Sequence, residues 1–231
     1  MAPNYEYTLI DEHEGERFIA AHFGEKILDL FRSLPNRALK SDLLRYLLLF
    51  KEGGYYGDLD TEPVKPLDQW VPNNLKNVVR LVVALEHDAG VFALGNWKYP
   101  VQFCQWTIVS APGHPVLESM IQRAIRGLEE LAQSGKMNLD KVKPTDRQVL
   151  SATGPQAWTE EIVKYLIQVA PEITSYESLL RTTEPKLYHD VLVYPLDGFM
   201  TLSAEMSLFE GAGEHQLAHH EFRGAWKQWD G

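Results

Sequence analysis

The sequence predicts an α/β fold, with helices packed against a mixed, mostly parallel sheet. Amphipathic segments with helical spacing alternate with short β-branched apolar runs along the chain. Glycine and proline residues separate most of these segments. The chain has 231 residues, so we expect residues 1–231 to form a single domain.

The first quarter of the chain contains four segments with regular patterns. The clearest is a helix that carries apolar residues on one side and ends at the Gly53-Gly54 pair. A strand that would carry two aspartates follows it directly. In chain order we expect a weakly alternating strand, two amphipathic helices and this short strand, at residues 5–10, 15–34, 37–52 and 55–60.

The pattern of residues after the aspartate segment predicts three strands and two helices. His114 and Pro115 open the longer helix, because proline is favoured in the first helical turn. Residues 134–154 are polar and are expected to be loop, and residues 200–216 fit no single pattern. The expected strands are residues 78–86, 105–110 and 191–194, and the expected helices are residues 115–133 and 156–170.

Composition excludes several classes of protein. The net charge of −10 repels phosphate backbones, so we expect no nucleic-acid partner. Cys104 is the sole cysteine, which excludes an internal disulfide and a cysteine-based zinc site. No stretch reaches the roughly 18 apolar residues that span a bilayer, and the acidic N-terminus does not read as a signal peptide. We therefore expect a soluble chain without a membrane segment.

The segment GGYYGDLD carries the chemistry that the sequence predicts most clearly. On a strand, Asp58 and Asp60 point to one face, while Leu59 points into the protein. Two adjacent carboxylates repel each other unless a positive charge lies between them. A divalent cation bound through oxygen, Mn²⁺ or Mg²⁺, meets this need.

The helix before this segment adds a second charged pair. Asp42 and Arg45 are three residues apart and share a helix face. The glycine turn folds the next strand back along the helix, which brings the pair towards Asp58 and Asp60. Taken alone, the two aspartates also fit a solvated acidic turn, and the pair fits a surface ion pair.

The complete pattern over residues 38–60, which joins the helix to the segment with the two aspartates, is more specific than either part alone. It resembles the sugar-binding region containing the DXD motif of glycosyltransferase family 32. Four further segments resemble, in order, blocks of fungal initiation-specific alpha-1,6-mannosyltransferases: residues 5–23, 101–121, 152–162 and 219–229. The matching motif positions are Ala38, Lys40, Ser41, Asp42, Arg45, Tyr46, Leu49, Gly53, Gly54, Tyr56, Asp58 and Asp60.

This resemblance implies a GT-A fold, a Rossmann-like α/β/α sandwich. It implies a retaining enzyme that transfers mannose from GDP-mannose to a mannose of an N-glycan, with an alpha-1,6 linkage. The expected cofactor is Mn²⁺, with Mg²⁺ as the alternative, and the expected compartment is the Golgi lumen. The expected partners are the nucleotide-sugar donor and the glycan acceptor.

The resemblance also assigns roles around the metal. Asp60 would ligate Mn²⁺ directly, and Asp58 would hold the ribose and contact the metal through water. His220 would be the third ligand, with the adjacent His219 as a competitor for that role. In the same C-terminal block, Ala225 stands where the family usually has serine.

Further residues would bind the donor. Asp42 and Arg45 would hold the hydroxyls of the transferred sugar, and Tyr56 would line the nucleotide pocket. Trp226 would pack near the diphosphate. Gln105 and Trp106 would line the cleft, and the loop at residues 153–155 would lie on its acceptor side.

Two alternatives remain open. Family members usually begin with a membrane anchor and a strand reading roughly Pro-x-x-Ile-His-x-x-Trp, and this chain starts after both. A truncated family member that binds nucleotide or glycan without transfer would therefore also fit. A phosphohydrolase of the haloacid dehalogenase type fits less well, because Glu62 occupies the position where its D-x-D-x-T or D-x-D-x-V loop requires Thr or Val.

Overall fold

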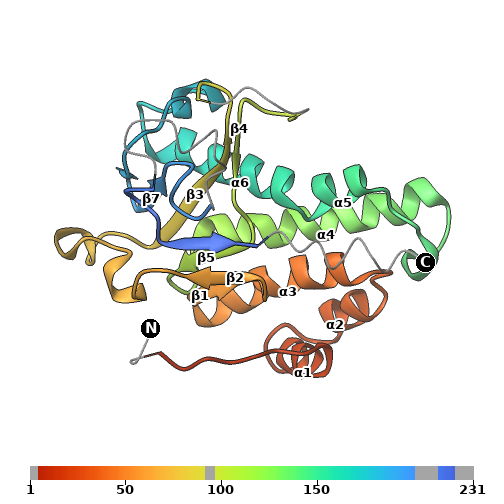
Figure 1. Cartoon of the computed structure of the whole chain (residues 1–231). Coiled ribbons are helices and arrows are strands. Elements are labelled where there is room, and N and C mark those ends of the chain that lie inside the picture. Colours follow the sequence, from red (N-terminus) through yellow and green to blue (C-terminus); the bar gives the residue numbers. More distant parts are fainter. Residues whose placement is uncertain (1–4, 92–96, 201–212, 222–231) are drawn as a thin grey trace.

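A computed structural model describes residues 5–91, 97–200 and 213–221 of the chain (Figure 1). The helices in these ranges are α1 (Glu12–His22), α2 (Glu25–Arg32), α3 (Arg37–Glu52), α4 (Pro115–Gly135), α5 (Asp146–Ala152) and α6 (Pro155–Val169). The strands are β1 (Gly54–Gly57), β2 (Thr61–Pro63), β3 (Leu81–Asp88), β4 (Val101–Phe103), β5 (Thr107–Ser110), β6 (Lys186–Tyr188), β7 (Val191–Tyr194) and β8 (Ala218–His220). Four short 3₁₀ helices are η1 (Leu67–Gln69), η2 (Asn73–Leu75), η3 (Leu139–Lys141) and η4 (Tyr176–Leu179).

The main sheet has the strand order β1-β5-β3-β7-β6, and β4 also pairs with β3. Within the described residues, β3 and β7 are parallel, whereas the pairs β1–β5, β3–β5, β3–β4 and β6–β7 are antiparallel. The predicted α/β class and mixed sheet are therefore confirmed, but the expectation of mostly parallel pairing was wrong. The turn between β6 and β7 is too short for the crossover helix that parallel pairing needs.

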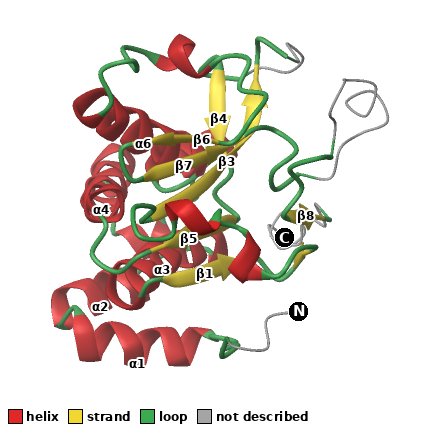
Figure 2. Cartoon of the chain, turned by 90° about the vertical axis from the view of Figure 1, so that its left-hand side faces the viewer, coloured by secondary structure: helices red, strands yellow, loops and turns green. Residues whose placement is uncertain are grey.

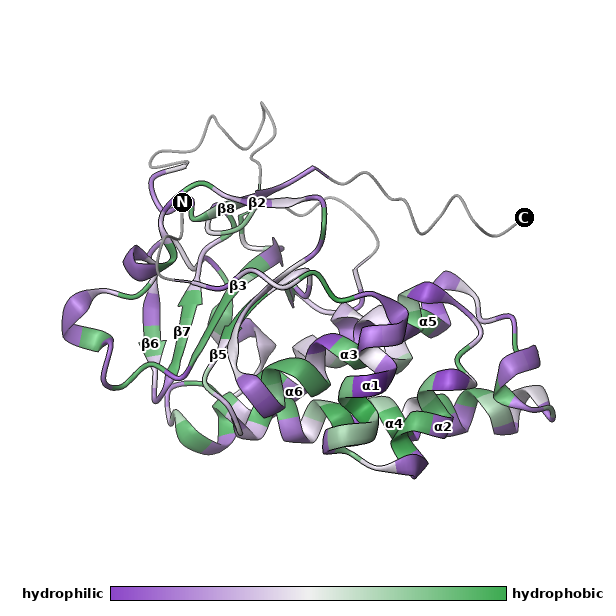
Figure 3. Ribbon diagram, turned by 90° about the horizontal axis from the view of Figure 1, so that it is seen from below, coloured by the Kyte–Doolittle hydropathy of each residue, from purple (hydrophilic) through white to green (hydrophobic). Residues whose placement is uncertain are grey.

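The two faces of the sheet are covered differently. Helices α3, α4 and α6 cover one face, and the opposite side carries the connecting loops and the β2–β8 pair (Figure 2). The strands β3, β5 and β7 are largely buried along their length, and apolar residues fill β7 and the first five positions of β3 (Figure 3), as expected for a sheet buried on both faces. The second face forms its own core around Trp70, Trp106 and Phe199.

Several predicted elements are confirmed. The helix α3 spans the predicted residues 37–52, with Asn36 as its N-cap and Gly53 as its C-cap. The helices α4 and α6 begin at Pro115 and Pro155, each proline in the first turn. Strand β7 also covers the predicted residues 191–194.

Outside the segment with the two aspartates, three predictions of secondary structure were wrong. The helix expected at residues 15–34 is two helices, because Gly24 adopts a φ of 78° that only glycine tolerates readily. Residues 5–10 form no strand, and Tyr7 and Leu9 are exposed. The expected loop at 134–154 contains α5, which a Thr145–Gln148 capping box begins.

No helix within the described residues combines the length and the apolar character that crossing a membrane requires.

A buried histidine begins α4 and predicts a pH dependence of stability. His114 is fully buried, and its Nδ1 accepts a hydrogen bond from the backbone N–H of Val116 at 3.2 Å. Burial lowers the pKa of His114 to about 4, against the opposing effect of Asp190, whose carboxylate lies 3.5 Å from Nε2. Arg80 and His189 lower this pKa further.

We expect the buried His114 to lower the free energy of unfolding in acid. An unfolded chain protonates histidine below about pH 6.5, while the folded chain keeps His114 neutral to about pH 4. The contribution of neutral His114 to the free energy of unfolding is therefore complete above pH 6.5 and is lost as the pH falls towards 4. The total loss is on the order of 3 kcal/mol. Urea unfolding between pH 4 and 8 measures it, and His114→Asn should flatten the profile while the exposed His13→Asn leaves it unchanged. An equally steep profile in His114→Asn would contradict the assignment.

Candidate functional site

The two motif aspartates lie in a turn that follows β1, not in a strand. β1 ends at Gly57, and the N–H of Thr61 donates to the carbonyl of Asp58 at 2.9 Å, which closes the turn. Leu59 is 82% exposed, so the prediction that it points into the protein was wrong. Antiparallel pairing with β5 stops at Gly57, and the chain then turns instead of continuing along the sheet.

Pairing between β2 and β8 brings the C-terminal histidine to this turn. Thr61 lies opposite His220, and the Nε2 of His220 lies 3.0 Å from Oδ1 of Asp60. His219 lies opposite Glu62, with its ring nitrogen 3.9 Å from that exposed carboxylate. Successive strand residues point to opposite faces, so the geometry places His220, and not His219, beside Asp60.

Asp58, Asp60 and His220 form a cluster whose chemistry fits a divalent cation. One potential ligand atom from each residue lies within 4.8 Å of the other two. Two carboxylate oxygens and one imidazole nitrogen suit Mn²⁺ and related ions. The three predicted residues therefore come together from two segments that are far apart in the sequence.

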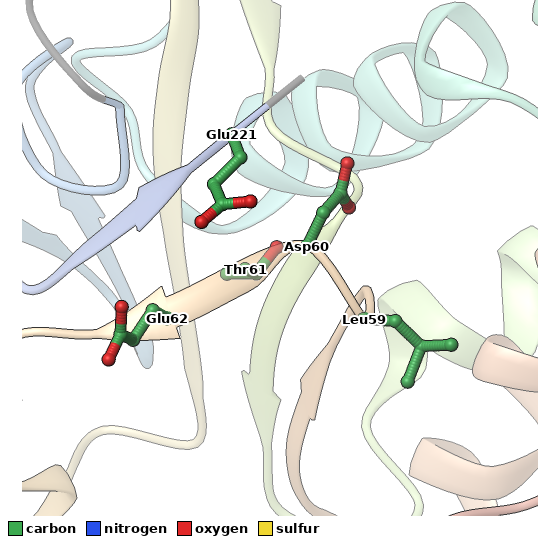
Figure 4. Close-up of a pocket in the computed structure, with 5 residues that line it drawn as sticks. All are labelled: Leu59, Asp60, Thr61, Glu62 and Glu221. Atoms are coloured by element: carbon green, nitrogen blue, oxygen red, sulfur yellow. The ribbon is translucent and has the colours of Figure 1, made fainter. Parts of the chain in front are cut away.

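Asp60 also lines a small surface pocket of about 200 Å³, together with Leu59, Thr61, Glu62 and Glu221 (Figure 4). In this view Leu59 points away from the other four side chains. Glu221 is held here because its N–H donates to the carbonyl of Asp60 at 2.9 Å. The sequence reasoning did not identify Glu221, although it directly follows His220.

The Arg45 guanidinium is the buried centre of the second half of the site. It is 5% exposed and lies 3.3 Å from a carboxylate oxygen of Asp42 and 3.3 Å from one of Asp58. It also donates to the carbonyl of Gln105 at 2.9 Å and to the hydroxyl of Ser41 at 3.0 Å. The predicted proximity of the helix pair and the motif aspartates is thus present in the structure.

The charges around Arg45 keep it protonated. Burial opposes its charge, but the carboxylates of Asp58 and Asp42 outweigh that effect, so the pKa of Arg45 is raised. Its guanidinium carbon lies 4.8 Å from the centre of the Tyr56 ring, an arrangement that a cation favours. Arg45 therefore provides a permanent positive charge between two carboxylates.

Asp42 is held by neutral donors in addition to Arg45. Its oxygens accept hydrogen bonds from the Thr153 hydroxyl at 2.7 Å and from the Gln105 amide at 3.1 Å. The same amide lies 2.5 Å from the hydroxyl of Tyr46. Burial raises the pKa of Asp42, although Arg45, Thr153 and Gln105 each favour its charged form. Gln105 and Thr153 therefore orient Asp42, and the sequence had indicated only that they lie near the cleft.

Tyr56 links the two halves of the site. Its hydroxyl donates to Oδ1 of Asp58 at 2.8 Å and lies 3.3 Å from the hydroxyl of Ser41. Burial raises the pKa of Tyr56, and Arg45 opposes this effect only in part. The phenol therefore acts as a neutral donor that orients Asp58.

Trp106 contacts the cluster in two ways. Its ring stacks on that of His220, with centroids 4.5 Å apart and planes 13° apart. Its carbonyl accepts a hydrogen bond from the N–H of Asp58 at 2.9 Å. The other predicted aromatic residue, Trp226, lies outside the described residues, as does Ala225.

Comparison with known proteins finds relatives among glycosyltransferases. Residues 1–76 match the family described as "Glycosyltransferase sugar-binding region containing DXD motif". The chain is 33% identical to the initiation-specific alpha-1,6-mannosyltransferase of Schizosaccharomyces pombe, over 97% of this chain and 57% of that protein. It is 28% identical to the protein of the same name from Candida albicans, over 97% of this chain and 64% of that protein.

Among solved structures, the PaToxG glycosyltransferase aligns with 20% identity and a TM-score of 0.38, over 59% of this chain and 39% of that chain. The chain spans about three fifths of the length of the two mannosyltransferases. The resemblance predicted from the sequence is confirmed: residues 1–76 match the DXD-containing sugar-binding region of glycosyltransferases, and the chain is similar along nearly its whole length to initiation-specific alpha-1,6-mannosyltransferases.

Proposed function

We propose that this chain is the catalytic domain of a metal-dependent, retaining mannosyltransferase of the GT-A type. Its donor would be GDP-mannose, and its acceptor a mannose of an N-glycan that receives an alpha-1,6 linkage. The observation that carries the proposal is the placement of Asp58, Asp60 and His220 within ligand distance of one another, beside the buried Asp42–Arg45 pair. The names of the two relatives support the sugar and the linkage. The compartment that the family resemblance implies is the Golgi lumen, and we propose it for this chain.

The cluster would hold Mn²⁺, or Mg²⁺ in its place. Asp60 and His220 would supply direct ligands, and Asp58 would contact the metal through water and hold the ribose. A bound divalent cation neutralises the negative charge that develops on a leaving diphosphate. Tyr56 would keep Asp58 oriented, since its hydroxyl already donates to that carboxylate.

Asp42 would bind hydroxyls of the transferred sugar. Its Oδ1 accepts a hydrogen bond from Gln105 and lies 3.3 Å from Arg45, while its Oδ2 accepts one from Thr153. A carboxylate oxygen accepts two hydrogen bonds, so Oδ2 retains capacity for a sugar hydroxyl. Arg45 would balance the charge of Asp42 and Asp58 and donate to the sugar from the same position.

The acceptor hydroxyl would attack on the face from which the diphosphate leaves. Trp226 would pack near that diphosphate. A covalent mannosyl-enzyme trapped with a slow substrate would contradict this direct route, because it requires a protein nucleophile.

Removing the proposed metal ligand should abolish turnover. We expect Asp60→Asn to reduce Mn²⁺-dependent release of GDP from GDP-mannose by a factor on the order of 100 or more, since the leaving group loses its charge stabilisation. Asp29→Asn on the exposed surface of α2 is the matched control and should act as wild type. If Asp60→Asn retains full activity, the metal role of Asp60 is wrong. A wild-type chain that binds GDP with Mn²⁺ but never turns over would favour a binding protein.

The melting temperature measured with different nucleotides tests which nucleobase the donor carries. GDP with Mn²⁺ should raise the melting temperature of the chain more than UDP with Mn²⁺, because a ligand that binds only the native state stabilises it by mass action. Omitting Mn²⁺ should remove most of the GDP effect. A larger shift with UDP would reassign the donor, while leaving the proposed metal site in place.

Loss of the buried cation should destabilise the fold. Arg45→Met leaves Asp42 buried without its partner, so we expect the free energy of unfolding to fall by about 3–5 kcal/mol in urea titrations. Asp42→Asn added to Arg45→Met should recover part of that loss, because it removes the uncompensated charge. The exposed Arg147→Met should leave stability unchanged. Equal stability of Arg45→Met and wild type would show that the pair contributes no net stabilisation.

A further inference from the structure

The strand that carries His220 is not part of the main sheet. Within the described residues β8 pairs with β2 alone, through three residues of each strand, and it lies to one side of the main sheet (Figure 2). A two-stranded ladder of this kind is at best marginally stable in water. The position of His220 beside Asp60 therefore depends on what fixes the chain just before β8.

A buried carboxylate holds the beginning of that segment. Asp197 is 7% exposed, and its Oδ2 accepts hydrogen bonds from the N–H of Gly213 at 3.0 Å and from the N–H of His215 at 3.1 Å. Hydrogen bonds to a carboxylate are stronger than those between neutral groups, so two of them on one oxygen make a firm attachment. None of the roles proposed above uses this buried charge.

The turn that carries Asp197 is itself fixed to the main sheet. It follows β7 directly, and the N–H of Gly198 donates to the carbonyl of Pro195 at 2.9 Å. A Cβ at Gly198 would lie 2.6 Å from that of Tyr194, the last residue of β7, so the turn packs closely on the strand. The carbonyl of Gly198 also accepts the N–H of Leu217 at 2.7 Å. The end of β7 therefore determines where β8 begins.

We propose that Asp197 is a positioning residue for the cation site, which anchors residues 213–217 to the end of β7 and thereby brings His220 beside Asp60. The inference rests on the proposed function, because it concerns the same metal site. It adds a residue that belongs neither to the motif nor to the ligand set.

The expected effect of losing the anchor follows from the fraction of molecules in which β8 is paired. Without Asp197, β8 would spend part of its time away from β2, and His220 would then be out of reach of the ion. The apparent dissociation constant for the ion rises in inverse proportion to the fraction of molecules that can bind it. An excess of the ion restores the paired state, because the ion binds that state better.

A first experiment tests the positioning without metal. In ¹⁵N-labelled, metal-free full chain, Asp197→Ala should move the ring resonances of His220 and speed amide hydrogen exchange at Glu221, whose N–H donates to the carbonyl of Asp60 just beyond β8. Asp197→Asn keeps an acceptor oxygen and should change both signals less. Unchanged signals of His220 and Glu221 in Asp197→Ala would overturn the proposal.

A second experiment tests the consequence for the cation. In calorimetric Mn²⁺ titrations, Asp197→Ala should weaken binding by about 10-fold, and Asp197→Asn by less than about 3-fold. The rate of GDP release at saturating Mn²⁺ should stay within about 2-fold of wild type, because the excess ion restores the paired state. Full Mn²⁺ affinity in a folded Asp197→Ala chain would contradict the positioning role.

Asp88 provides the matched control. It is fully buried, and its oxygens accept the N–H of Gly90 at 2.8 Å and that of Thr182 at 3.2 Å, so it makes the same kind of contact with other loops. Asp88→Ala should therefore bind Mn²⁺ as wild type. A loss equal to that in Asp197→Ala would assign the effect to general destabilisation and refute the proposal.

A double-mutant cycle tests whether Asp197 acts through His220. In a His220→Ala background, Asp197→Ala should weaken Mn²⁺ binding no further, because the ligand that it positions is already absent. An equal further loss would show that Asp197 acts by another route. If the wild-type chain binds no Mn²⁺, the proposed metal site fails, and the metal-free exchange and spectra alone decide whether Asp197 positions β8.

Discussion

The structure depends most on one buried positive charge. Arg45 lies between Asp42 and Asp58, which belong to different elements, and it also fixes the backbone before β5 through the carbonyl of Gln105. Helix, motif turn and central sheet are thus held in register by a single guanidinium. A planar group with five donors can satisfy several acceptors at once, which a lysine at this position could not reproduce. Burying such a charge costs desolvation free energy, and the carboxylates and hydrogen-bond acceptors around the guanidinium offset that cost.

The sequence predicted the membership of the site better than its geometry. Asp42, Arg45, Tyr56, Asp58 and Asp60 lie within one short segment, and a helix followed by a glycine turn was sufficient to bring them together. The reason given for the proximity of Asp58 and Asp60 was nevertheless wrong, since both lie in a turn. A short turn and a strand place residues i and i+2 at similar distances, so the pattern alone could not distinguish them.

Long-range contacts were the least predictable part. Gln105 and Thr153 orient Asp42 from distant segments, and no local pattern of charge or periodicity indicates these bonds. The choice of His220 over His219 required the register of β2 and β8, because adjacent strand residues differ only in the face they occupy. The fold class was predictable from alternating patterns, but the antiparallel pairing was not, since buried strands of both kinds are apolar.

The pairing of β2 with β8 links the proposed ligand set to the topology of folding. Asp60 and His220 are 160 residues apart in sequence, so their contact closes most of the chain into one loop. A three-residue ladder is too short to be stable alone, and Leu217 and Ala218 anchor it by packing into the second core. Such non-local contacts form only after loop-closure entropy has been overcome, which makes them late events in folding. The cation site would therefore be completed late in folding, after the segments that carry Asp60 and His220 have paired.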